Sequence, residues 1–199
     1  MKRGVLMHKK LFFCCSSSSG CREMILRELG ESLASAGGFI TEQAVGEEGS
    51  LLGLDLFPTA AAAVDGFIGA RFLDMTVVPP KTDNEVFRVE AVRLLQEAPY
   101  YPFAVLDSIG GFELVIPQFR EALAAFLSSS VPCIGILRPL EEAELMRGFL
   151  GLGERCTAFA ARLRSALEAD DETMLLDVPG ELEAGHIAAL HQWVETFTH

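Results

Sequence analysis

The stretch KKLFFCCSSSSGCREMILREL, from Lys9 to Leu29, decides the fold of this chain. An apolar run leads into four serines and Gly20, after which leucines recur at helical spacing from Leu26 to Leu33. The pattern predicts a strand, a polar loop and a helix. The glycine pair Gly37-Gly38 is expected to end that helix.

A loop between a strand and a helix is a common place for phosphate binding, because backbone N–H groups and the helix N-terminus attract anions. In the phosphate-loop pattern G-x-x-x-x-G-K-[ST], the lysine neutralises phosphates and the hydroxyl binds magnesium. Here Gly20 fits the second glycine, but Cys15 stands at the first glycine, Cys21 at the lysine and Arg22 at the hydroxyl. The stretch is either an altered phosphate loop or a serine-rich turn in which Ser19 caps the helix. In the first interpretation, the binding residues are Ser16, Ser17, Ser18, Ser19, Gly20, Cys21 and Arg22.

The cysteines of this stretch allow other interpretations. A cysteine phosphatase has five residues between its cysteine and its arginine, and after Cys15 the arginine arrives one residue late. A metal site is disfavoured, because Cys14 and Cys15 are adjacent in a strand and point to opposite faces. Cys21 is either a small buried residue or a thiol whose pKa the helix N-terminus lowers.

Composition limits the classes of function. The 199 residues are half hydrophobic, which predicts one domain over residues 1–199 with a sizeable core. The net charge of −12 disfavours nucleic acid and anionic membranes as partners. No apolar run reaches the length of a signal peptide or membrane span, and the odd number of cysteines favours a reducing compartment. We therefore expect a soluble, cytoplasmic protein.

The rest of the chain alternates between strand and helix patterns. GFITEQAV and SLLGLDLF, over residues 38–57, predict a β-hairpin, whereas residues 58–72 follow no clear pattern. FAVLD (103–107) and VPCIGIL (131–137) are continuous apolar runs typical of buried parallel strands. Helices are expected at about 84–96, 117–129, 141–150 and 157–167, followed by a strand from 173 and a closing helix to 197. This order predicts an α/β fold with a mostly parallel sheet flanked by helices and a β-hairpin after the first helix.

Two further segments carry a family resemblance. GGFITE (Gly37–Glu42) and VLDSIGGFEL (Val105–Leu114) resemble signatures of the cancer-related nucleoside-triphosphatase family, small P-loop proteins that hydrolyse ATP, GTP and other nucleotides. The resemblance runs in order from about Val5 to Leu137. It implies a P-loop NTPase-like fold and, as ligands, magnesium with ATP or GTP.

The departures from that family bear on activity. The resemblance places Asp107 where the family has its magnesium-associated aspartate, but Ser108 stands where the presumed catalytic glutamate would be. Gly111 occupies a position that is usually basic. Glu113 matches the family and is a tentative catalytic acid; the alternatives are a solvated strand-end acid for Asp107 and a loop-helix junction charge for Glu113.

Three hypotheses follow. A lost charge-assisted hydrogen bond costs about 1.5–3 kcal/mol, and the loss of a group that activates water slows a reaction about 10²–10⁴-fold. The first hypothesis is therefore a weak nucleotide or anion binder, a pseudoenzyme with impaired or absent NTP hydrolysis. The second is an atypical NTPase that uses Arg22 and Glu113. The third is a non-catalytic interaction module that pairs with another protein or with a second copy of itself.

Overall fold

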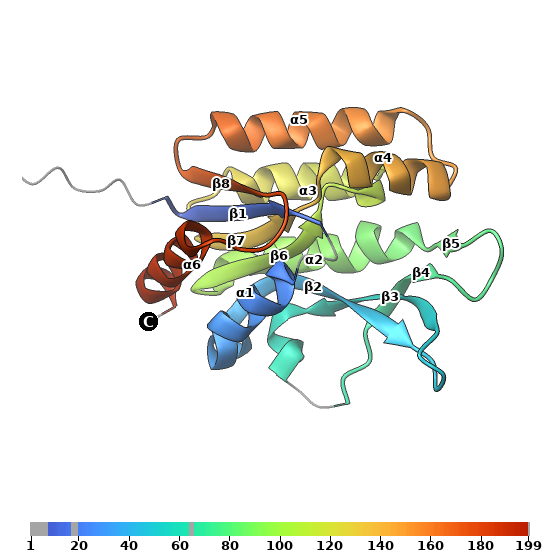
Figure 1. The fold of residues 1–199 in the computed structure, drawn as a ribbon, viewed down its shortest axis with the longest axis horizontal. Coiled ribbons are helices and arrows are strands. Elements are labelled where there is room, and N and C mark those ends of the chain that lie inside the picture. The colour runs from blue at the N-terminus through green and yellow to red at the C-terminus, as the bar shows by residue number, and fades with distance from the viewer. Residues whose placement is uncertain (1–7, 17–19, 64–65, 199) are drawn as a thin grey trace, which may run out of the picture.

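The computed structural model describes residues 8–16, 20–63 and 66–198, and within them the strands form one eight-stranded sheet (Figure 1). The order across the sheet is β5-β4-β3-β2-β6-β7-β1-β8. The strands are β1 (Lys10–Cys15), β2 (Ala36–Val45), β3 (Leu51–Pro58), β4 (Ala70–Asp74), β5 (Lys81–Thr82), β6 (Phe103–Ile109), β7 (Cys133–Leu137) and β8 (Thr173–Val178).

The sheet has a parallel part and an antiparallel extension. β2, β6, β7, β1 and β8 pair in parallel, as the continuous apolar runs predict. β2 and β3 form the predicted antiparallel hairpin, with Phe39 opposite Pro58. β4 and β5 continue the antiparallel part. The mostly parallel α/β fold with a hairpin after the first helix is therefore confirmed.

Helices cover both faces of the sheet. The α-helices are α1 (Cys21–Leu29), α2 (Val92–Glu97), α3 (Pro117–Leu127), α4 (Leu140–Phe149), α5 (Arg155–Ala169) and α6 (Ala184–Phe197). Short 3₁₀ turns lie at η1 (Gly30–Ser35), η2 (Thr59–Ala63), η4 (Ala98–Tyr100) and η5 (Phe112–Val115), and a π-helical segment, η3 (Val86–Ala91), precedes α2. α1 and α6 pack on one face, and α2, α3, α4 and α5 contribute to the core on the other (Figure 1).

The alternation of β1 divides its side chains between two hydrophobic cores. Phe12 and Cys14 belong to the core beneath α2 to α5, whereas Phe13 and Cys15 belong to the core beneath α1 and α6. Successive side chains of a strand point to opposite faces, so this division follows from the sequence alone. It confirms that the side chains of Cys14 and Cys15 point to opposite faces of the sheet. All five cysteines are buried, and none of them is in a disulfide.

The first helix differs from the prediction at both ends. α1 ends at Leu29, and Gly30 follows it with a φ of 48°. Gly37 and Gly38 lie inside β2, so their interpretation as the end of the helix is wrong. A Cβ on Gly38 would lie 2.1 Å from the carbonyl oxygen of Val105, which explains the glycine by close approach of two strands. At the other end, Gly20 precedes the helix in the left-handed conformation and serves as its N-cap, the position predicted for Ser19.

The segment 58–72, which has no clear sequence pattern, contains η2 and most of β4. Within the described residues, no helix is both long enough and apolar enough to cross a membrane.

Candidate functional site

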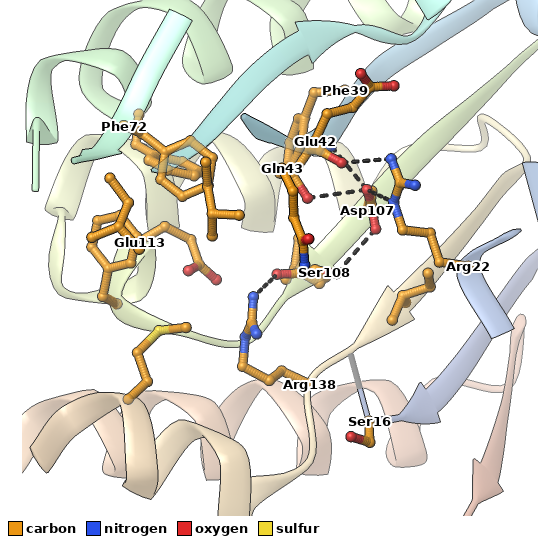
Figure 2. A pocket seen from close by; sticks show the side chains of 18 of the residues that line it. Ser16, Arg22, Phe39, Glu42, Gln43, Phe72, Asp107, Ser108, Glu113 and Arg138 are labelled. Carbon is orange, nitrogen blue, oxygen red and sulfur yellow. Dashed lines mark hydrogen bonds and ion pairs between the residues drawn. The ribbon is translucent and has the colours of Figure 1, made fainter. Parts of the chain in front are cut away.

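The carboxyl ends of the parallel strands meet at one edge of the sheet, where α/β proteins commonly bind ligands. There the structure has a cavity of about 870 Å³. Its lining includes Ser16 after β1, Asp107 near the end of β6 and Arg138 after β7. Figure 2 shows side chains of this cavity, with Arg22 and Asp107 on one side and Phe72 and Glu113 on the other.

Asp107 is the centre of a hydrogen-bond network that joins three elements. Its Oδ2 accepts hydrogen bonds from Arg22 Nε at 2.8 Å and from the Thr41 N–H at 2.8 Å. The Thr41 hydroxyl donates to the same oxygen at 3.1 Å. Arg22 also donates through Nη2 to the Thr41 carbonyl at 2.5 Å (Figure 2). The carboxylate is 2% exposed, so its charge is compensated inside the protein by the guanidinium of α1.

Ser108 gives the end of β6 an unusual backbone. Its φ is 56°, which is uncommon for a residue other than glycine. The pairing of β6 with β7 shifts between Leu106 and Ile109, as in a β-bulge. The Ser108 hydroxyl donates to Asp107 Oδ1 at 3.0 Å, and its carbonyl accepts a hydrogen bond from Arg138 Nη2 at 3.2 Å. Ser108, which the resemblance aligns with a glutamate, therefore hydrogen-bonds to Asp107.

Glu113 is buried in the turn that follows β6. Its Oε1 accepts hydrogen bonds from the backbone N–H groups of Gly110 at 2.6 Å and Gly111 at 2.7 Å. Burial raises the pKa of this carboxyl, while Arg138 and the two N–H groups oppose the rise. Glu113 lines the same cavity as Arg22 and Asp107.

The predicted loop residues are only partly described. Ser16 lines the cavity, and its hydroxyl donates to Glu142 Oε1 at 2.5 Å. Ser17, Ser18 and Ser19 lie outside the described residues. Arg138 lies 3.7 Å from Glu142 Oε2, so α4 is linked both to the loop and to the end of β7.

Cys21 does not fit a reactive thiol. Its side chain is fully buried, and its pKa is raised, first by its hydrogen bond with Cys15 and then by burial. The direction is opposite to the lowered pKa of the reactive-thiol interpretation. The cysteine at the lysine position is a buried core residue that packs with Ile25 and Leu29 of α1.

The donor set around Asp107 does not fit a magnesium ion. Magnesium needs several oxygen ligands in near-octahedral geometry. Here Arg22 and Thr41 already occupy Asp107 Oδ2, and Arg22 itself stands at the hydroxyl position of the loop. In the described part of the chain, no group of three or more metal-ligating side chains comes together. The magnesium role of Asp107 stays a prediction from the resemblance. It would require Arg22 to release the Asp107 carboxylate.

Three residues of this network were not among the predicted site residues. Thr41 lies in the GGFITE segment, so that segment contained a signal for it. Arg138 and Glu142 come from the end of β7 and from α4, where the sequence shows only a strand followed by a helix. For Arg138, the sequence signal of a site residue was its position directly after a buried parallel strand.

The fold and the position of the cavity define a protein with the α/β fold of small P-loop NTPases. One solved structure with this fold is THEP1 from the hyperthermophile Aquifex aeolicus, with a TM-score of 0.58 and 14% sequence identity over 96% of this chain and 99% of that one. Another is a human cancer-related nucleoside triphosphatase, with a TM-score of 0.58 and 17% identity over 95% and 96% of the two chains. No protein-family model and no curated protein matches the sequence. At these identities the likeness concerns the fold.

Proposed function

We propose that this chain is a divergent P-loop NTPase-family protein that binds a nucleotide or a phosphate-like anion weakly, with impaired or absent hydrolysis. The observation that carries the proposal is the ion pair between Arg22 and Asp107 at the cavity. It puts a fixed positive charge in the first turn of α1, beside the helix N-terminus that would face the phosphates.

Part of the Arg22 guanidinium remains accessible to a ligand. Its side chain is 26% exposed and lines the cavity, while its Nε and Nη2 hold Asp107 and Thr41 in place. A guanidinium carries five N–H donors, so donors beyond these two contacts are available for a phosphate oxygen. Because the cation belongs to the protein, anion binding at this site should not require magnesium.

Neither Ser108 nor Asp107 is placed to act as the base for hydrolysis. The Ser108 hydroxyl donates its proton to Asp107, and Asp107 Oδ2 accepts three hydrogen bonds. Neither group is therefore ready to take a proton from water. Losing such a group typically removes about 10²–10⁴-fold in rate.

The test is calorimetric titration of the whole chain with ATP, GTP and pyrophosphate, once with magnesium and once with EDTA. A phosphate-release assay runs on the same samples. We expect weak binding that is equal in both buffers, with little or no release. Arg22→Gln should weaken binding, whereas Arg27→Gln, an exposed control on the same helix, should not. Binding that depends on magnesium, or that is unchanged in Arg22→Gln, would contradict the proposal.

A second candidate is an atypical NTPase that uses Arg22 and Glu113. The observation in its favour is a buried acid with a raised pKa at the same cavity, a combination frequent at active sites. It predicts slow phosphate release that Glu113→Gln abolishes. Release that persists in Glu113→Gln would exclude this role for Glu113.

A further inference from the structure

One part of the cavity is lined by apolar side chains, and its Phe72 lies across the cavity from the ion pair (Figure 2). We call it the apolar lobe and define it by Leu54, Phe72, Met75, Phe112, Leu145 and Phe149. Its members come from β3 and β4 with the residue after β4, from η5, and from α4. In Figure 2, Phe72 and Glu113 lie on this side, separated from Arg22 and Asp107.

The lobe has a rigid aromatic base. The rings of Phe72 and Phe112 are stacked, with centroids 5.9 Å apart and an angle of 27° between their planes. Phe87 meets both rings edge-on, at 5.1 Å and 5.4 Å. Each ring is therefore held by its neighbours, and the small exposed parts of Phe72 and Phe112 line the cavity.

The rim of the lobe exposes apolar side chains to solvent. Leu145 is 73% exposed and Phe149 53% exposed, and both lie one turn apart on α4. Leu51, at the start of β3, also lines the cavity and is 40% exposed. Single exposed apolar residues are ordinary, but here they gather at the rim of a cavity with an aromatic base. A ligand that covered them would gain apolar burial.

Two polar groups meet at the base of the lobe. A Cβ on Gly111 would lie 2.9 Å from Glu113 Oε2, 3.0 Å from Met146 Sδ and 3.1 Å from Arg138 Nε. These three atoms therefore surround one point above the Gly111 backbone. Because the amides of Gly110 and Gly111 hold Oε1 of Glu113, Oε2 is the oxygen that lies beside this point.

The charges at this side of the cavity do not favour an anion. Arg138 lies at the base of the lobe beside Glu113, whereas Asp107 lies toward Arg22 (Figure 2). Arg22 is paired with Asp107, and Arg138 lies 3.7 Å from Glu142. The burial of Glu113 favours its neutral form, which can donate a hydrogen bond to a carbonyl or hydroxyl group.

We infer that the apolar lobe binds an uncharged, flat apolar molecule that carries one carbonyl or hydroxyl group, which Glu113 recognises. Known small-molecule sites combine a cavity of roughly 300–1,000 Å³ with apolar walls and few polar groups, as this cavity does. This site lies in the same cavity as the proposed anion site but uses other residues, and the inference does not rest on nucleotide binding.

The experiment uses 2-naphthol and its anionic counterpart 2-naphthalenesulfonate, each titrated into the whole chain and followed by ligand fluorescence. We expect 2-naphthol to bind and the sulfonate to bind at least about tenfold more weakly, since a charge must be desolvated among apolar side chains. Leu145→Ser and Phe149→Ser should each weaken 2-naphthol binding several-fold, because each removes apolar surface from the rim.

Both substituted residues are exposed, so both variants should fold, and circular dichroism with a thermal melt checks this. Tyr100→Ser is the matched control, because Tyr100 is also highly exposed but lies in η4, outside the cavity lining. It should bind 2-naphthol as the unaltered chain does. Absence of 2-naphthol binding, tighter binding of the sulfonate, or equal binding in folded Leu145→Ser and Phe149→Ser would each overturn the inference.

Discussion

Arg22 Nε and Asp107 Oδ2 lie 2.8 Å apart, although 85 positions separate the two residues in the chain. The pair joins the first turn of α1 to the carboxyl end of β6. Its partners are unequal, because Asp107 is buried whereas Arg22 reaches the cavity surface. One arginine therefore compensates a buried charge and also keeps part of its side chain exposed in the cavity.

Removing Arg22 should destabilise the fold. Arg22→Ala leaves the Asp107 carboxylate buried without its ion-pair partner, a change that typically costs about 3–5 kcal/mol, and the partial exposure of Arg22 places the expected cost near the low end. Chemical denaturation of the variant measures the loss. The double variant Arg22→Ala with Asp107→Asn should recover part of it, since no buried charge is then left unpaired. Equal stability of the single and double variants would show that the two side chains are not coupled.

Glu113 should make the folded state less stable as the pH rises from acid toward neutral. Its folded pKa lies above the ordinary value of 4.5, so the folded state holds the proton more tightly than the unfolded chain. Stability should therefore fall as pH rises from 4.5 toward the folded pKa. Glu113→Gln removes this loss, so its unfolding free energy should improve relative to the unaltered chain over that range.

The control for this prediction is Glu121→Gln, an exposed substitution on α3. Its difference from the unaltered chain should stay nearly constant with pH. If Glu113→Gln behaves in the same way, burial does not hold the Glu113 carboxyl in its neutral form.

Gly38 should not tolerate a side chain. Its φ is 81°, and a Cβ would lie 2.1 Å from the Val105 carbonyl oxygen of the neighbouring strand. Gly38→Ala should cost about 3 kcal/mol or more, because backbone strain and a clash with backbone add together. Gly148→Ala provides the contrast, since a Cβ there meets nothing within 4 Å. In α4 it should change stability by less than about 1 kcal/mol, in the favourable direction. Thermal denaturation of the two variants distinguishes these outcomes.

Asp170 should support the fold against mild acid. Lys10 and Thr173 donate hydrogen bonds to its carboxylate and lower its pKa from 3.8 to about 2. The folded state thus favours the ionised form, and this contribution is present above pH 3.8 and is lost as pH falls to about 2. The unaltered chain should exceed Asp170→Asn in stability near neutral pH, and the two should converge by pH 2. A constant gap across an acid titration followed by circular dichroism would rule out this role.

Much of the fold follows from local pattern. The apolar runs of β6 and β7 are long enough to be buried on both faces, and their continuous hydrophobicity predicts parallel strands in the centre of a sheet. The hairpin of β2 and β3 follows from two β-rich runs around a short glycine-flanked turn. β4 has no such signal, because the strand has only five residues and follows an alanine-rich segment. Its pairing depends on the edge that β3 offers.

The sequence by itself identified Arg22 through the altered loop pattern and Asp107 through the acid that ends a buried apolar run, whereas Glu113 became a candidate through the family resemblance. Tertiary structure decided their partners. The contacts of Asp107 with Arg22 and Thr41 arise because parallel strands end at one edge of a sheet, where residues distant in sequence meet. Tertiary structure also explains Gly38. Together with Gly37 it has the local signal of a helix end, but it lies in β2, where the Val105 carbonyl of the neighbouring strand approaches it closely. Local propensity acts over a few residues, whereas close packing between strands sets which atoms share a site.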